Sequence, residues 1–176
     1  MYTEIMELDE KGPLFSYISP EQRDLLREGF HLVEFVKTDS AKFTDYSFVV
    51  FPFAKAYEGF LKQVFLDAGF ISQTDYSSKY FRVGKVLSPN LVRRLGKQSV
   101  YKQICDSVGC ELGEEMWKTW RRGRNQVFHY FPHNLQSLDI QEAEAIISDI
   151  VATMNRVVGE IKLIQVKNRL QGNFAT

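Results

Sequence analysis

Apolar residues recur every three or four positions along most of the chain, which is the spacing of one face of an α-helix. The clearest example runs from about residue 44 to about residue 68 and stops at Gly69. Its apolar positions are Tyr46, Val49, Val50, Phe53, Tyr57, Phe60, Leu61, Val64 and Ala68. Almost no stretch alternates between apolar and polar residues as a half-buried strand would, so the pattern predicts an all-α protein.

Capping signals mark the starts of two further long helices. Ser19 is followed by Pro20 and, at the third helical position, by Gln22, so a helix should begin there and run to about residue 37. Asp139 and Glu142 form a similar capping box before a final helix that should reach about residue 166. Shorter elements are expected as helices over about 88–95 and 99–107, with a polar, turn-rich loop over 69–87.

These elements predict an up-and-down bundle of at least four principal helices, preceded by an arm over residues 1–18. A length of 176 residues suits a single domain with its own core. The chain has no apolar run long enough to span a membrane and no signal-peptide pattern, so we expect a cytoplasmic protein. Cys105 and Cys110 are too few for a zinc quartet, and in this setting we expect free thiols.

Charge is balanced over the chain but unevenly distributed. Residues 79–124 contain eleven Lys or Arg and four Asp or Glu. Such a basic segment suits binding of a polyanion, although a solvated helix face would give the same pattern. Tyr76, Tyr80 and Phe81 interleave with these cations and could stack on bases or belong to the core.

Candidate chemistry concentrates in a helix expected over about 113–130. Its apolar arc consists of Met116, Trp117, Trp120, Val127, Phe128 and Phe131. Arg124 projects from the middle of this arc, and burying a guanidinium without an acceptor would cost several kcal/mol. We therefore expect Arg124 to have a partner, an interface or a ligand.

Arg124 and His129 are about 140° apart on an ideal helix, whereas Asn125 and His129 share one face. One interpretation is a cation and a titratable imidazole that act on a phosphate. The other is a core-facing helix whose Arg pairs with an acid and whose His caps the helix end before Pro132. The two residues alone leave both open. A metal site is not expected, because Pro132 should break the helix between His129 and His133.

The run from Arg124 through Asn125 to His129 resembles the Arg-Asn-x3-His signature of HEPN domains, small all-helical domains found in many bacterial toxin and defence ribonucleases. Asp45-Tyr46-Ser47 and the segment 56–62 resemble the HEPN domain of the RnlA/LsoA toxins, and the likeness covers about 40–165. It implies catalytic roles for four residues, Asp45, Glu58, Arg124 and His129. We add five candidates for binding or positioning the substrate, Asn125, Arg121, Arg122, Lys118 and Tyr130. RnlA toxins also carry amino-terminal domains that this chain is too short to hold.

The resemblance implies a metal-independent endoribonuclease of a toxin–antitoxin or phage-defence system, without a cofactor. Its partners would be an RNA substrate, an antitoxin protein and a second copy in a symmetric dimer, because HEPN ribonucleases typically pair two Arg-His motifs in one cleft. Two alternatives remain open. One is a non-catalytic HEPN-like module that binds nucleotide, RNA or protein, and the other is a helical scaffold in which Glu58 and Arg124 form a structural pair. Asp45 could equally be a helix cap.

Overall fold

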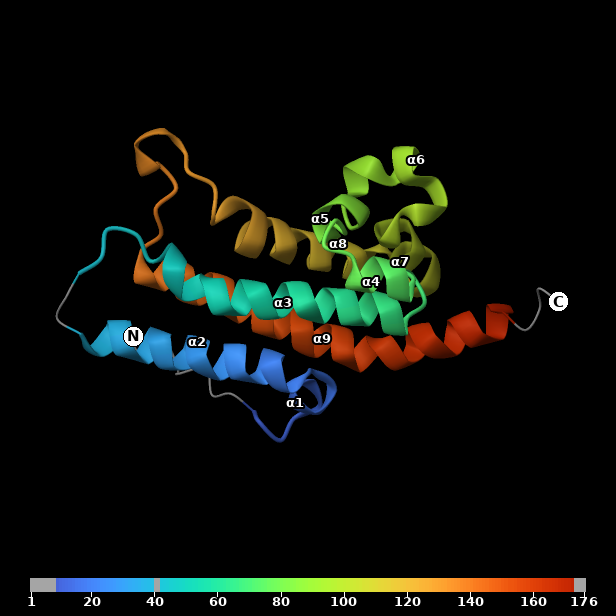
Figure 1. The fold of residues 1–176 in the computed structure, drawn as a ribbon, viewed down its shortest axis with the longest axis horizontal. Helices are drawn as coiled ribbons and strands as arrows, with labels where there is room; N and C mark the ends of the chain where they lie inside the picture. The colour runs from blue at the N-terminus through green and yellow to red at the C-terminus, as the bar shows by residue number, and fades with distance from the viewer. Residues whose placement is uncertain (1–8, 40–41, 173–176) are drawn as a thin grey trace.

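The computed structural model describes residues 9–39 and 42–172, with side chains as far as residue 161, and every regular element in these ranges is helical (Figure 1). This confirms the all-α prediction. The four longest helices are α2 (Pro20–Thr38), α3 (Ser47–Asp67), α8 (Cys110–Trp120) and α9 (Ile140–Gly172). Figure 1 shows that each of them runs opposite to the one before it, as in an up-and-down bundle.

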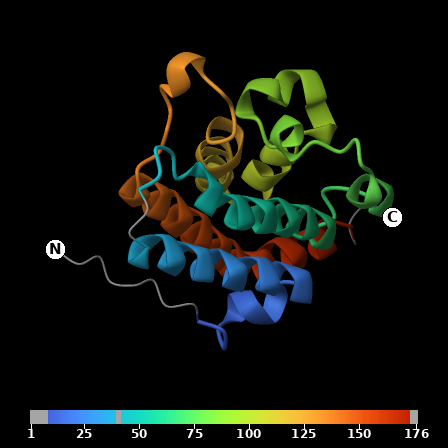
Figure 2. The same ribbon diagram turned by 60° about the vertical axis from the view of Figure 1, so that its left-hand side comes forward.

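Helix α3 lies at the centre of the molecule, in contact with α2 and α9. Figures 1 and 2 both show α2 on one side of α3 and α8 on the other. Because it packs on several sides, α3 buries ten residues, which are Val49, Val50, Phe53, Ala54, Ala56, Tyr57, Phe60, Leu61, Val64 and Phe65. The Tyr57 hydroxyl donates a hydrogen bond of 3.1 Å to the backbone carbonyl of Met116, which fixes α8 against α3. Burial raises the pKa of Tyr57, so this hydroxyl keeps its proton.

Both predicted capping boxes are confirmed. At the start of α2, the Ser19 side chain accepts a bond from the Gln22 backbone, and the Gln22 side chain accepts one from the Ser19 backbone. Before α9, Glu142 and Asp139 exchange the equivalent bonds at 2.7 and 2.9 Å. Helix α9 then continues past the expected end near residue 166 to Gly172.

Several short helices were not expected from the sequence. Helix α1 (Pro13–Tyr17) lies in the predicted amino-terminal arm and packs on α9. The predicted loop over 69–87 contains α4 (Gln73–Ser77) and α5 (Val83–Val86). These elements are too short for a helical period to be recognised. The segment that follows, where helices were predicted over about 88–95 and 99–107, consists of η1 (Pro89–Leu91), α6 (Val92–Leu95), η2 (Gly96–Gln98) and α7 (Val100–Val108).

The expectation of free thiols is wrong. Cys105 in α7 and Cys110 at the start of α8 form a disulfide. The turn between them contains Gly109, whose φ of 101° lies in the left-handed region that glycine adopts most easily. The disulfide therefore joins the two helices across a tight turn and fixes the start of the helix that leads to the candidate site.

No helix in the described part of the chain combines the length and apolar character that crossing a membrane requires.

Candidate functional site

The segment over 113–130, which the sequence predicted to be a single α-helix, changes its helix type partway along. Helix α8 ends at Trp120 and continues as the π-helix η3 (Arg121–Gln126). Each π-helical hydrogen bond spans five residues rather than four, so residues five apart come closer to one face than in an α-helix. The prediction of about 140° between Arg124 and His129 assumed a regular α-helix, whereas Arg124 lies in η3 and His129 lies three residues past its end.

Gly123 allows η3 to pack closely on α9. A Cβ atom at this position would lie 2.9 Å from Cδ1 of Ile150 and 3.1 Å from its Cγ1. Ordinary van der Waals contacts of a Cβ atom are 3.4–4 Å, so a larger residue would require a shift of the Ile150 side chain or of the two elements. The backbone that carries Arg124 is therefore packed directly on the core.

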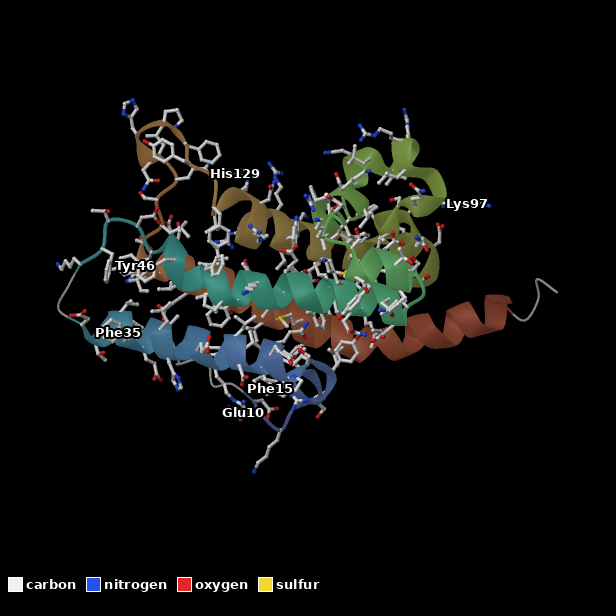
Figure 3. All side chains as sticks on the ribbon, in the orientation of Figure 1. Glu10, Phe15, Phe35, Tyr46, Lys97 and His129 are labelled. Carbon is white, nitrogen blue, oxygen red and sulfur yellow. A yellow bond between two sulfur atoms is a disulfide. The ribbon has the colours of Figure 1, made fainter. Side chains whose placement is uncertain are left out.

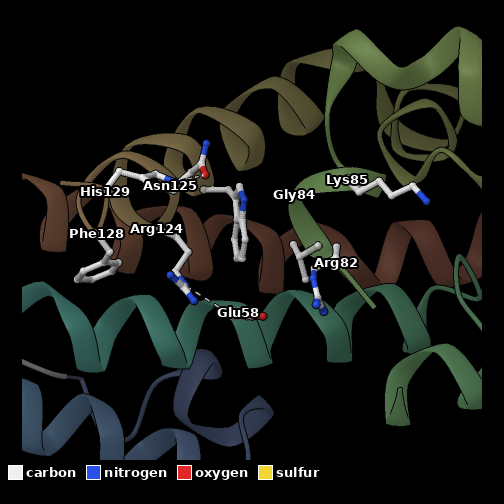
Figure 4. A pocket seen from close by; sticks show the side chains of 10 residues that line it. Glu58, Arg82, Gly84, Lys85, Arg124, Asn125, Phe128 and His129 are labelled. Atoms are coloured by element: carbon white, nitrogen blue, oxygen red, sulfur yellow. Dashed lines mark hydrogen bonds and ion pairs between the residues drawn. The ribbon is translucent and has the colours of Figure 1, made fainter. Parts of the chain in front are cut away.

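A pocket with a cavity volume of about 300 Å³ lies between η3, α3 and α5 (Figure 4). It brings together three residues that the sequence assigned to catalysis and one assigned to positioning, from two distant parts of the chain. The lining residues are Glu58, Arg82, Val83, Gly84, Lys85, Trp120, Arg124, Asn125, Phe128 and His129.

Arg124 has an acidic partner, which is one of the outcomes that the sequence left open. Its Nε donates to Oε2 of Glu58 over 3.3 Å, and its guanidinium carbon lies 5.5 Å from the centroid of the Phe128 ring. The two charged side chains are 38% and 33% exposed, so the full cost of burying a guanidinium does not arise. A pair this exposed contributes about 1 kcal/mol at most. Neither Nη atom of Arg124 hydrogen-bonds to any residue in the described ranges, which leaves both available for an anion.

The His129 ring is positioned by its neighbour one turn earlier. Its Nε2 lies 3.3 Å from Oδ1 of Asn125, and the ring is exposed to solvent. In the neutral tautomer that carries its proton on Nε2, that nitrogen donates to Asn125 and Nδ1 keeps its lone pair. This arrangement can take up a proton at Nδ1.

Cations outnumber acids around the pocket. Arg82, Lys85 and Arg124 line it together with one carboxylate, that of Glu58. Arg82 and Lys85 were not among the residues predicted for the site. The basic segment over 79–124 gave a signal for them, but only the tertiary fold brings α5 opposite η3. The positive balance makes the pocket suited to a phosphate or another anion.

Asp45 lies at the start of α3, roughly 20 Å along the helix axis from Glu58. Its carboxylate accepts bonds from the backbone and hydroxyl of Ser47, at 2.9 and 2.6 Å. It also accepts from Nδ2 of Asn134 and the backbone N–H of Leu138, at 3.1 and 3.2 Å. Partial burial alone would raise the pKa of Asp45, but these bonds outweigh it and lower the pKa. The geometry supports a structural role, which ties the segment before α9 to α3.

The other predicted positioning residues lie elsewhere. Arg122 forms an ion pair with Asp149 of α9, and Lys118 pairs with Glu114 one turn away at 3.5 Å. Arg121 and Tyr130 are exposed. Of the five residues predicted to position the substrate, Asn125 is the one that lines the pocket.

In the part of the chain that the structure describes, no three His, Cys, Asp or Glu side chains are grouped so that they could hold a metal ion. Comparison with known proteins found no matching protein family, no similar curated protein and no similar solved structure. The resemblance to HEPN domains therefore stays a prediction that depends on the sequence motif.

Proposed function

We propose that the protein is a metal-independent endoribonuclease whose active site is the pocket formed by Glu58, Arg124, Asn125 and His129. The observation that carries the proposal is the placement of Arg124 and His129 in one pocket with a positive balance of charge. Glu58 holds Nε of Arg124 and leaves both Nη atoms to contact a phosphate, while Asn125 orients the imidazole.

In the proposed reaction, the 2′-hydroxyl oxygen of RNA attacks the adjacent phosphorus and the bond from phosphorus to the 5′-oxygen breaks. The products are a 2′,3′-cyclic phosphate and a 5′-hydroxyl. His129 takes the proton of the 2′-hydroxyl at Nδ1, which keeps its lone pair when Nε2 donates to Asn125. Arg124 donates to the non-bridging phosphate oxygens, where negative charge develops in the transition state.

The leaving 5′-oxygen also needs a proton, and one imidazole does not readily supply both steps. A symmetric dimer would bring a second His129 to the same phosphate as the acid, and two-fold association is the commonest way in which identical surfaces pair. As a toxin, the protein would be held inactive by an antitoxin that covers the pocket or keeps the two copies apart.

A second candidate is a non-catalytic module that binds RNA or nucleotide in the same pocket. The observation that favours it is that His129 is the one imidazole among the pocket-lining residues. Such a module would still use Arg124 and its neighbours to bind a phosphate, but it would leave the RNA intact.

The test is incubation of the protein with RNA in excess EDTA, followed by separation of the fragments. The proposal predicts cleavage that is lost in His129→Ala and Arg124→Ala, with the helical circular dichroism unchanged. His31→Ala is the matched control, because His31 is exposed on α2 and no residue of α2 lines the pocket. Intact RNA that nevertheless binds tightly, with an affinity that falls as salt rises, would favour the module instead.

A further inference from the structure

Aromatic side chains continue outward from the pocket along α3. The Phe128 ring, which lies against Arg124, packs edge-to-face on Phe51 with the centroids 5.7 Å apart. Phe51 is 51% exposed, and Phe48, one turn earlier on α3, is 39% exposed. Phe48 in turn packs on Phe43 at 5.1 Å between centroids. We call Phe48, Phe51 and Phe128 the aromatic strip.

The position of the strip relative to the charges indicates what it binds. Figure 4 places Phe128 on one side of Arg124 and Arg82 on the other, so the pocket has an aromatic flank and a basic flank. A ligand that is held in the pocket and extends over an adjoining exposed ring gains free energy by removing the ring from water. A second copy in the proposed dimer would bring its own Arg82, Lys85 and Arg124, so the charge of the pocket still requires an anionic ligand. A nucleic-acid strand matches both flanks, because its flat bases can contact the aromatic flank and its phosphates can contact the basic flank.

We propose that the aromatic strip stacks the unpaired bases next to the phosphate held by Arg124, so that the substrate is single-stranded at this point. The inference deepens the proposed function and rests on it for the position of the phosphate. Every base offers a flat face to an aromatic ring, and stacking of this kind tolerates any sequence. A duplex keeps its bases stacked on one another and has no face to offer.

Phe51 is the residue to test, because its ring is 51% exposed and it does not itself line the pocket. Two probes are compared with the wild-type protein by fluorescence anisotropy. The first is a short single strand with 2′-deoxyribose, which carries bases but has no 2′-hydroxyl to attack. The second is an abasic strand of equal length, which carries the same phosphates without bases.

Phe51→Ala should weaken binding of the base-bearing strand about 10-fold and leave binding of the abasic strand unchanged, because one base loses its stacking partner. Phe51→Tyr should bind as the wild type does, whereas Phe51→Leu should behave like Phe51→Ala, since leucine is apolar but offers no flat face. The control is Phe35→Ala, because Phe35 is 59% exposed but lies on α2, across α3 from His129 (Figure 3).

Equal affinities of Phe51→Ala and wild type for the base-bearing strand would overturn the inference. So would a change in the sedimentation of Phe51→Ala without any change in strand binding, because the strip would then hold a second copy. RNA cleavage separates the two proposals. If RNA is cut and Phe51 has no effect, the inference fails alone, and if RNA stays intact while the Phe51-dependent binding holds, the nuclease proposal fails alone.

Discussion

A methyl group added at Gly84 should disturb the floor of the pocket. Gly84 lies in α5 and faces the indole of Trp120. A Cβ atom at this position would lie 2.6 Å from Nε1 of Trp120 and 3.4 Å from its Cε2. Cβ atoms normally keep 3.4–4 Å from such neighbours. The indole, which is 8% exposed and rigid, or the whole of α5 must therefore move by roughly 1 Å, a typical case of overpacking.

Two opposing effects determine how Gly84→Ala changes the free energy of unfolding. Overpacking of a filled site destabilises by about 1–3 kcal/mol. Replacing Gly by Ala in a helix gains at most about 1 kcal/mol, and the gain is smaller in a helix as short as α5. Gly84→Ala should therefore lower the free energy of unfolding by about 1–2 kcal/mol. Because Trp120 and Gly84 both line the pocket, RNA cleavage should fall as well.

Urea unfolding followed by tryptophan fluorescence measures this change, and Gly159→Ala is the matched control. Gly159 is exposed in α9, and a Cβ atom there would meet nothing within 4 Å. The same substitution should stabilise the protein at this position by about 0.5–1 kcal/mol. The two variants should thus shift stability in opposite directions. If Gly84→Ala stabilises the protein as Gly159→Ala does, the close packing of α5 on Trp120 is refuted.

Three further variants test other contacts. Asp45→Ala should lower the free energy of unfolding at neutral pH by about 1–2 kcal/mol. The pKa of Asp45 lies below its ordinary value of 3.8 in the folded protein, so the advantage of the wild type is present above that value and is lost as pH falls through the folded pKa; urea unfolding over a pH series checks this. Replacing Cys105 and Cys110 together by Ser should lower the free energy of unfolding by about 2 kcal/mol. The measurement is a Tm that is lower than in the wild type and no longer responds to reductant. An unchanged Tm would show that the disulfide does not form. Gly123→Ala should destabilise by about 1–2 kcal/mol in denaturant unfolding through contact with Ile150, and a neutral result would contradict the close approach of η3 and α9.

The parts of the fold that the sequence predicts well depend on local signals. Ser19 and Asp139 cap their helices through residues three positions later, and such bonds need no tertiary information. The apolar positions of α3 recur so regularly that its burial could be predicted in the same way. The short helices α4 and α5 give too few residues for a period, which explains why 69–87 was predicted as a loop.

In the candidate site, too, some features were predicted from the sequence and others were missed. The pairing of Glu58 with Arg124 was expected and is present. The contributions of Arg82 and Lys85 were missed, since they depend on how α5 folds over η3. The π-helix could not be predicted either, because a wheel drawn at 100° per residue assumes α-helix throughout. The likeness to HEPN domains gave Asp45 a catalytic role, whereas its contacts support a structural one.

The most direct test of the nuclease proposal is the chemistry of the ends that the protein leaves on RNA in the presence of EDTA. Attack by the 2′-hydroxyl predicts fragments with a 2′,3′-cyclic phosphate and a 5′-hydroxyl, and His129→Ala should produce none of them. Fragments with a 5′-phosphate and a 3′-hydroxyl would contradict the proposed reaction, and RNA that stays intact under all conditions would contradict the proposed activity itself.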